Sequence, residues 1–299
     1  MKKSTLGIVF AILAALCYSL VNPINKLINS DISPLFSASM LYFGTFLVGL
    51  IYFLVQIIFK KCQSKDNLEK KDIPYLLLAI LFHSGAAISL MFGLTYLSSS
   101  NASLLGSFEL ISTSLIAFLL FKENISKWLW IGIIFIFSAC VIISLGDLEN
   151  LNFSIGSILC LISPICFGFA NNFLKKISHK NPAISIGLIG LGGGLISLIV
   201  GFIVGERFVS FTPVIIEVSV GMISYGIALI LFIYAERFVG ASKTSAFFSL
   251  APFIAIILSL IIFQEVPNYT FYIGLGLLVI GTIFASLDAM LEKSANKHL

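Results

Sequence analysis

The chain has 299 residues, of which 59% are hydrophobic and only 11% charged, and its formal net charge is +4. Soluble domains carry about 25% charged residues, so this chain has too few polar side chains to cover a water-facing surface. Its mean hydropathy of +1.07 excludes a water-soluble fold and indicates an integral membrane protein.

The positive charge does not indicate nucleic-acid binding. The basic residues form short clusters between apolar runs, such as Lys60 with Lys61 and Lys175 with Lys176, rather than a stripe along one face. The sequence contains no CxxC pair, P-loop, zincin helix or nucleophile elbow. We therefore expect no metal, no cofactor and no nucleic-acid partner.

Ten segments have the length of a transmembrane helix, which needs about 20 mostly apolar residues. A helix satisfies its own backbone hydrogen bonds in lipid. In the first half the expected spans are Leu6–Asn25, Leu35–Phe59, Ile73–Leu97, Ala102–Phe121 and Trp128–Leu145. In the second half they are Phe153–Leu174, Ala183–Val204, Val214–Tyr234, Thr244–Phe263 and Tyr269–Leu287. The expected fold is an all-α integral membrane protein with ten transmembrane helices.

The basic residues also predict the orientation, because they favour cytoplasmic loops. With the N-terminus inside, sixteen of the eighteen Lys and Arg residues lie in inner segments, and only Lys26 and Arg207 lie in outer ones. We expect a multi-pass protein of the cell inner (cytoplasmic) membrane with both termini cytoplasmic.

Cys62 offers a test of this topology, because it lies in the predicted cytoplasmic loop Lys60–Asp72. An impermeant thiol reagent added to intact cells should fail to label Cys62. Clear labelling of Cys62 from outside would contradict the predicted orientation.

An internal repeat runs through the chain. Five positions recur 149 residues later: Cys17, Tyr18, Ser19, Asn22 and Lys26 match Cys166, Phe167, Gly168, Asn171 and Lys175. Phe121-Lys122-Glu123 recurs 142 residues later as Phe263-Gln264-Glu265. Each repeat has five spans, an odd number, so the second repeat must enter the membrane from the opposite side, as in many secondary transporters. We expect two inverted five-helix repeats, residues 1–148 and 149–299.

In this repeated order the chain resembles the EamA-type transporters of the drug/metabolite transporter superfamily, over nearly its whole length. Family repeats tend to carry an aromatic-small pair followed by a Lys, matched here by Tyr18-Ser19 with Lys26 and by Phe167-Gly168 with Lys175. Leu110 stands where the family often has Pro. Span one lacks the acidic residue that couples protons in the related small multidrug-resistance proteins. The resemblance implies a secondary transporter, not an enzyme, and favours an exporter of amino acids or related metabolites.

Polar and aromatic side chains at mid-depth are the candidates for substrate binding, because ionisable groups inside spans are costly and commonly functional. His83 in span three corresponds to Tyr225 in span eight at the 142-residue offset. The expected substrate-binding residues are Tyr18, His83, Glu109, Ser112, Phe167 and Tyr225. Two alternatives stay open at this point: His83 could bond a neighbouring helix, and Tyr18 and Phe167 could serve packing alone.

Two polar pairs are candidates for gates. Asn22 and Lys26 share one face of span one, and Asn171 and Lys175 repeat the pair on span six. At a rise of about 1.5 Å per residue, the two Asn lie roughly 9 Å from mid-depth on opposite sides. They suit an outer and an inner gate, unless both Lys only reach for the interface. Glu109, the one acidic residue well inside a span of the first half, is a candidate for proton coupling.

Span seven carries a glycine-rich pattern with small residues four positions apart. Such spacing lets helix backbones approach closely in membranes. We expect this helix to pack tightly against a neighbour.

The expected partners are a small-molecule substrate and the lipid bilayer; the residues indicate no oligomeric state. An uptake or exchange carrier for nucleotide sugars or phosphorylated sugars would need several cations in the cavity, but only Lys26, Lys175 and Lys243 are available, all near span ends. A membrane enzyme or structural subunit would need a catalytic cluster or a large soluble face. The aromatic and polar layer instead favours an amphipathic or zwitterionic solute.

Overall fold

The structure is a computed structural model that describes residues 3–59, 68–122, 125–145, 151–177, 180–206, 211–239, 244, 247–264 and 266–295. The described part of the chain is almost entirely helical and contains no strand. It holds nine helices long and apolar enough to cross a membrane, together with a shorter apolar helix, Ala251–Phe263. The all-helical fold expected from the sequence is therefore confirmed.

The helices of the first half follow the expected spans closely. They are α1 (Lys3–Ser19), α2 (Val21–Ile28), α3 (Pro34–Ile58), the short η2 (Lys70–Asp72), α4 (Ile73–Tyr96), α5 (Ser99–Gly106), α6 (Phe108–Phe121) and α7 (Lys127–Leu145). Those of the second half are α8 (Leu151–Lys176), α9 (Pro182–Val204), α10 (Phe211–Val220), the π-helix η3 (Gly221–Ile227), α11 (Ala228–Val239), α13 (Ala251–Phe263) and α14 (Tyr269–Ala295).

Several spans are interrupted where the sequence predicted a single helix. The expected span Leu6–Asn25 divides into α1 and α2, because Pro23 has no N–H to donate to the Ser19 carbonyl. In the expected span Thr244–Phe263, Thr244, Phe247 and Phe248 are helical, a turn follows at residues 249–250, and α13 begins at Ala251, where Pro252 suits the first turn. Span four breaks at Ser107 without a proline, and the Ser107 hydroxyl donates to the Leu104 carbonyl at 2.6 Å.

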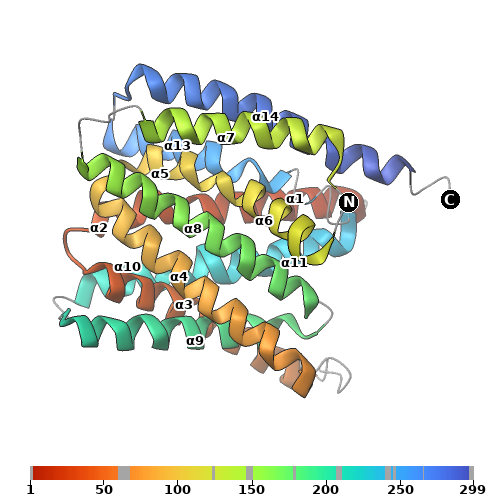
Figure 1. Ribbon diagram of the computed structural model, residues 1–299. Coiled ribbons are helices and arrows are strands. Elements are labelled where there is room, and N and C mark those ends of the chain that lie inside the picture. The colour runs from red at the N-terminus through yellow and green to blue at the C-terminus, as the bar shows by residue number, and fades with distance from the viewer. Residues whose placement is uncertain are drawn as a thin grey trace.

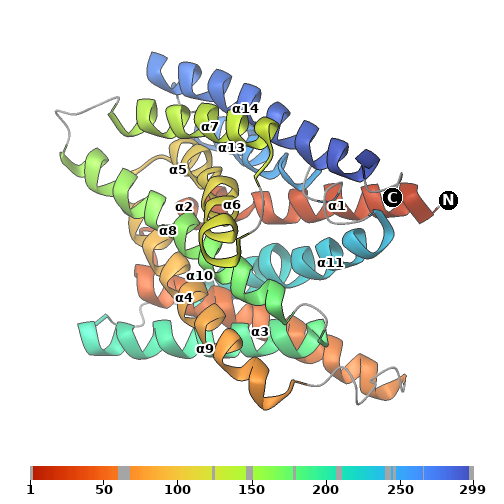
Figure 2. The same cartoon turned by 45° about the vertical axis from the view of Figure 1, so that its right-hand side comes forward.

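Helices of the two halves are interleaved. The most extensive contacts pair α3 with α9, α4 with α8, α7 with α14 and α1 with α11. Figures 1 and 2 show α7 with α14 along one edge of the molecule and α3 with α9 along the other. In span order these pairs are two with seven, three with six, five with ten and one with eight. If each span is replaced by its equivalent in the other half, the same four pairs result. The pair three with six becomes eight with one, and the other two pairs become themselves.

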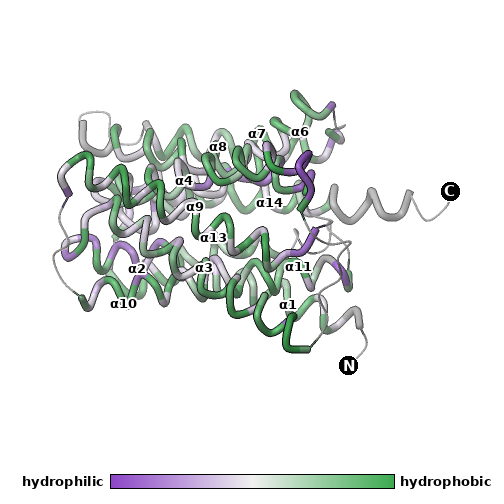
Figure 3. Tube along the Cα trace, turned by 90° about the horizontal axis from the view of Figure 1, so that it is seen from below, coloured by the Kyte–Doolittle hydropathy of each residue, from purple (hydrophilic) through white to green (hydrophobic). Residues whose placement is uncertain are grey.

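The start of α1 and the end of α14 lie at the same end of the bundle in Figure 1, which we call the terminal end. Figure 3 shows hydrophobic residues along most of the helix lengths and more hydrophilic segments toward their ends. Many of the outward side chains are large and apolar, for example Leu119 and Ile203. Such a surface is suited to lipid rather than water.

The backbone repeats at the offset that the sequence predicted. Among the described residues, the non-glycine positions with positive φ are Lys122 (56°) and Gln264 (49°), which end α6 and α13 and lie 142 residues apart. The neighbouring Glu123 and Glu265 lie outside the described residues, as do Cys62, Lys243 and the expected repeat boundary between residues 148 and 149.

Glycines bring α9 against α3, which confirms the expected tight packing of span seven. A Cβ placed on Gly190 would lie 2.8 Å from the Tyr42 carbonyl oxygen, and one on Gly193 would lie 2.9 Å from the Tyr42 ring. Neither position has room for a larger residue. The two contacts hold α3, and Tyr42 with it, at a fixed depth beside α9.

Candidate functional site

Six ring side chains meet where helices of the two halves cross, and we call them the central aromatic cluster. They come from α1, α3, α4, α8, η3 and the segment before α13, and are Tyr18, Tyr42, His83, Phe167, Tyr225 and Phe248. Each ring centroid lies between 5.4 and 6.3 Å from at least one other in the cluster. Four of these residues are predicted binding residues, and the structure brings those four together.

The cluster contains two equivalent ring pairs. Tyr18 lies 5.8 Å from Tyr225 at an interplanar angle of 64°, and His83 lies 5.5 Å from Phe167 at 73°. The sequence offsets pair Tyr18 with Phe167 and His83 with Tyr225, so each edge-to-face contact is the counterpart of the other. The cluster thus lies where the two halves meet.

Two polar atoms in the cluster are buried and lack a hydrogen-bond partner in the described part of the chain. The side chains of His83 and Tyr225 are 9% and 8% exposed, and within the described residues neither His83 Nε2 nor the Tyr225 hydroxyl has a hydrogen-bond partner. Leaving such a group unpaired costs about 1–3 kcal/mol. A few polar groups in an otherwise apolar and aromatic lining are typical of a small-molecule site.

Tyr42 holds His83 in place. Its hydroxyl donates to the His83 carbonyl at 2.7 Å and lies 3.4 Å from His83 Nδ1. The contact engages one ring nitrogen and leaves Nε2 for another partner. Tyr42 was not among the predicted binding residues. A tyrosine in the middle of an apolar span is nevertheless a signal, because its hydroxyl needs a partner when it is buried.

Glu109, in the first turn of α6, joins the cluster through Tyr18. The Tyr18 hydroxyl donates to Oε2 at 3.4 Å, and Asn171 Nδ2 on α8 donates to Oε1 at 2.8 Å. The sequence estimate of depth assumed upright helices and placed Asn171 well away from mid-depth. In the structure its side chain reaches Glu109, because the helices tilt and the glutamate side chain is long. A predicted gate residue and a predicted binding residue are joined by one hydrogen bond.

Ser112 contacts the backbone of α8. Its hydroxyl lies 2.6 Å from the Pro164 carbonyl and 3.0 Å from that of Phe108. Gly168 permits this approach, because a Cβ there would lie 2.8 Å from the Ser112 side chain. These contacts tie α6 to α8, and a role of Ser112 in substrate binding stays a prediction.

The two predicted gate pairs lie toward opposite ends of the bundle. On α2, Asn22 Nδ2 donates to Ser103 Oγ at 3.0 Å, and Lys26 Nζ donates to the Leu94 carbonyl at 2.6 Å. Lys175 lies exposed in the last turn of α8, near the terminal end. Among these residues, Asn171 reaches the cluster through its hydrogen bond to Glu109, which in turn contacts Tyr18.

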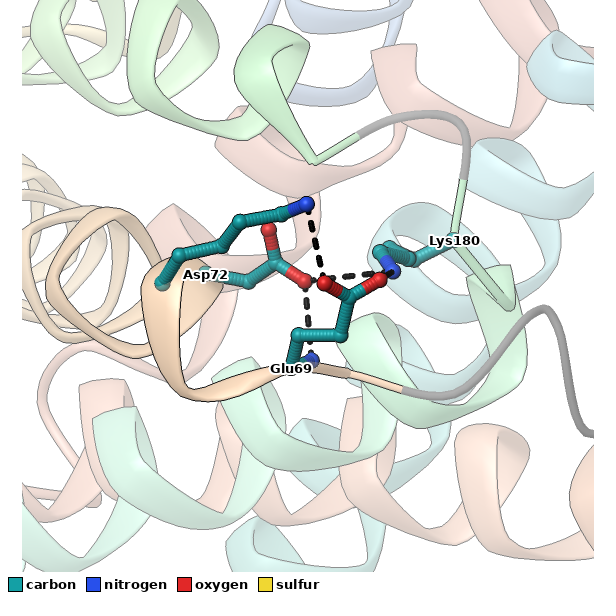
Figure 4. A network of polar contacts seen from close by, with 4 residues as sticks. Glu69, Asp72 and Lys180 are labelled. Carbon is teal, nitrogen blue, oxygen red and sulfur yellow. Dashed lines mark hydrogen bonds and ion pairs between the residues drawn. The ribbon is translucent and has the colours of Figure 1, made fainter.

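The terminal end also carries an ion-pair network between the halves (Figure 4). Lys180, whose side chain is 2% exposed, lies 2.6 Å from Glu69 Oε1 and 3.4 Å from Asp72 Oδ2. Lys180 and Lys71 together lower the pKa of Glu69 from 4.5 to about 2. Because the pKa is lowered by folding, the contact stabilises the structure above pH 4.5 and is lost as the pH falls towards 2.

Replacing Lys180 with Met should lower the melting temperature of the purified protein, because Asp72 is buried and would lose its cation. Lys71→Met is the matched control. Lys71 pairs with the same Glu69 at 2.8 Å, but its side chain is 72% exposed, and exposed pairs contribute little. Equal melting temperatures for the two variants would show that the Lys180 pair adds no stability.

At the opposite end, Glu206 caps α3. Its carboxylate accepts from the Leu35 amide at 3.2 Å and the Phe36 amide at 3.3 Å. A carboxylate at a helix N-terminus is favourable because it satisfies free N–H groups. Glu206 follows α9 in the second half, so this contact also joins the two halves.

Glu217, on α10, was also not among the predicted site residues. Its side chain is completely buried, and its Oε1 lies within hydrogen-bond distance of the hydroxyl of Ser37 on α3. The signal was available, because an acidic residue inside an apolar span is a functional candidate.

Comparison with known proteins identifies the family. The EamA-like transporter family matches residues 5–145 and 154–287 of the chain. The uncharacterized transporter YyaM of Bacillus subtilis is 24% identical over 78% of this chain and 79% of its own length. An uncharacterized transporter of Methanothermobacter thermautotrophicus is 26% identical over 87% of this chain and 80% of its own.

Two further comparisons cover almost the full length. An uncharacterized transporter of Clostridium kluyveri is 25% identical over 95% of this chain and 93% of its own. A solved crystal structure superposes with a TM-score of 0.69 at 15% identity, covering 95% of this chain and 98% of that one, which shows the shared fold. The chain is a multi-pass membrane transporter that belongs to the EamA-like transporter family.

Proposed function

We propose that this transporter moves a small amphipathic or zwitterionic metabolite across the cytoplasmic membrane by alternating access, as an exporter of amino acids or related compounds. The observation that carries the proposal is a pair of buried polar atoms in the central aromatic cluster, His83 Nε2 and the Tyr225 hydroxyl, which have no partner among the residues that the structure describes. A bound solute with its own donors and acceptors would satisfy both.

The chemistry of the cluster supports this substrate class. Its ring faces suit flat or apolar parts of a solute, and its polar atoms suit neutral hydrogen-bonding groups. The cluster contains no Lys or Arg, and Lys26 is bonded to the Leu94 carbonyl. Carriers of phosphorylated sugars or nucleotide sugars need cations at the binding level, so the composition of the cluster favours the zwitterionic alternative.

The contacts between the halves support alternating access. Glu206 ties the halves at one end, and Lys180 with Glu69 and Asp72 ties them at the terminal end. When the transporter opens at one end, the contacts between the halves at that end would break, and the contacts at the other end would keep that end closed. The matched contact pattern and the shared 142-residue offset support two inverted repeats, which rock against each other around a central site in many transporters. The distribution of basic residues supports a cytoplasmic terminal end.

Glu109→Gln should reduce the pH dependence of the half-saturating substrate concentration. Glu109 faces Tyr18 on α1 and Asn171 on α8, and both of its contacts come from neutral donors. Protonation would change which of these bonds it accepts and so alter the Tyr18 side of the cluster. The measurement is flux at several pH values. An unchanged pH profile in the variant would make Glu109 a structural link between α1, α6 and α8.

The substrate itself can be identified with proteoliposomes. Vesicles with and without the protein are loaded with a mixture of amino acids, sugar phosphates and other metabolites, and the compounds that leave only the protein-containing vesicles are identified by mass spectrometry. We expect zwitterionic solutes among them. Release of sugar phosphates alone would overturn the proposed substrate class.

A further inference from the structure

Glu217 is a fully buried carboxyl group that the proposed substrate site does not use. It lies on α10, four residues before the π-helix η3 that holds Tyr225. Its side chain is 0% exposed, and Oε2 has no hydrogen-bond partner within the described residues. Segments of π-helix are often found at functional sites, because they loosen the regular hydrogen bonding of a span.

The contacts of Ser37 indicate which form of Glu217 fits this site. The Ser37 hydroxyl contacts both Glu217 Oε1 and Met91 Sδ, the latter at 3.2 Å. A hydroxyl has one proton, and a thioether sulfur can only accept. If Ser37 donates to Met91, the contact with Glu217 needs a proton on Oε1. The carboxylic acid satisfies both contacts at once, whereas a carboxylate would take the Ser37 proton from Met91.

No nearby cation replaces that proton in the described structure. Helices α2 and α3 and the π-helix η3 pack against α10, and α4 packs against α2 and α3. These elements and the residue capping α3 carry the following charged or titratable groups nearest to Glu217 in the chain's packing order: Lys26, Tyr42, Tyr225, His83 and Glu206. Lys26 bonds the Leu94 carbonyl, and Glu206 bonds the α3 amides. The described hydrogen bonding of Glu217 is with Ser37 alone. A buried carboxylate without a cationic partner would be costly.

Close packing keeps water away from the carboxyl group. A Cβ on Gly44 of α3 would lie 2.8 Å from the Met222 amide nitrogen, and Gly221 lies against the Leu41 backbone. Helices α10 and η3 therefore contact α3 almost backbone to backbone. An ionised Glu217 needs water, and water needs these elements to separate. Glu217 therefore cannot be ionised while α10 and η3 are packed against α3 as observed.

We propose that Glu217 and Ser37 form a proton-binding site, and that release of its proton is linked to separation of α10 from α3. The ligand is the proton, bound as a carboxylic acid on Glu217 Oε1. Because α10 continues into η3, such a separation moves Tyr225 and couples the proton to the central aromatic cluster. The site lies toward the end where α10 begins, so the proposed orientation makes it exchange protons with the outside.

Infrared spectroscopy of the protein in lipid tests proton binding without any substrate. The measurement is made in a Glu109→Gln chain, so that Glu109 contributes no carboxylic-acid band. We expect the C=O stretch of a protonated carboxylic acid at neutral pH, and we expect this band to disappear at alkaline pH. Adding Glu217→Gln should abolish the band, and Ser37→Ala should shift its frequency by removing the hydrogen-bond partner. A band that persists in the Glu217→Gln chain, or no band at neutral pH in its parent, would overturn the site.

Hydrogen–deuterium exchange tests the linked movement. Peptides covering Phe211–Ile227 should exchange faster in the wild-type chain than in Glu217→Gln at alkaline pH, and equally fast at neutral pH. Comparing the two chains at one pH cancels the intrinsic effect of pH on exchange. Equal exchange at alkaline pH would overturn the link to helix separation. Neither measurement depends on the substrate, so both can fail while the proposed transport function stands.

Discussion

Tyr225→Phe should weaken transport about fivefold while leaving the protein folded. The hydroxyl has no protein partner in the described structure, so its removal breaks no internal hydrogen bond. A neutral hydrogen bond to a ligand contributes about 1 kcal/mol, which corresponds to roughly fivefold in affinity. His83→Ala should cost about tenfold or more, because it removes both Nε2 and one ring of the lining. The measurement is flux of the identified substrate at subsaturating concentration.

A double variant separates ligand contact from general damage. If His83 and Tyr225 touch one ligand, the losses of the two single variants should not add in the combined variant. Cys140→Ala is the control, because Cys140 is buried on α7 away from the cluster contacts and should leave flux unchanged. Equal, small effects of all three substitutions would place the binding site elsewhere. The Tyr42 bond survives His83→Ala, since it goes to the His83 carbonyl.

The repeat in the sequence was the strongest predictor of the cluster. Offsets of 149 and 142 residues single out Tyr18 with Phe167 and His83 with Tyr225, and these four rings meet in the structure. A repeat places equivalent side chains around the meeting point of the two halves, so positions that match in both halves are found without coordinates. The apolar spans were recognised separately, from their length and hydropathy.

Features that occur in one half only were harder to predict. Tyr42 and Phe248 have no aromatic counterpart at these offsets, so the repeat could not mark them. Glu217 was missed for the same reason, although its charge within an apolar span was a sufficient signal. The break at Ser107 also escaped prediction, because no proline marks it and only tertiary packing decides whether a span bends there.

Gly190→Val should reduce the stability of the folded transporter more than any other change considered above. A Cβ at Gly190 would lie 2.7 Å from Phe46 Cα and 2.8 Å from the Tyr42 carbonyl oxygen, and both are backbone atoms that cannot rotate away. Overpacking of this kind costs about 1–3 kcal/mol, or more where the backbone must move. We expect a lower melting temperature in detergent and a smaller yield of monodisperse protein.

Gly276→Val on α14 is the matched control, because a Cβ there would meet no atom within 4 Å. It adds the same side chain to a span and should leave the melting temperature unchanged. In Gly190→Val the displaced helix is α3, which carries the Tyr42 that holds His83, so the folded fraction should also transport more slowly per molecule. Equal melting temperatures for the two variants would mean that α3 and α9 are separated by more than the structure shows. A stability loss without a loss of flux per folded molecule would show that the position of Tyr42 does not control the cluster.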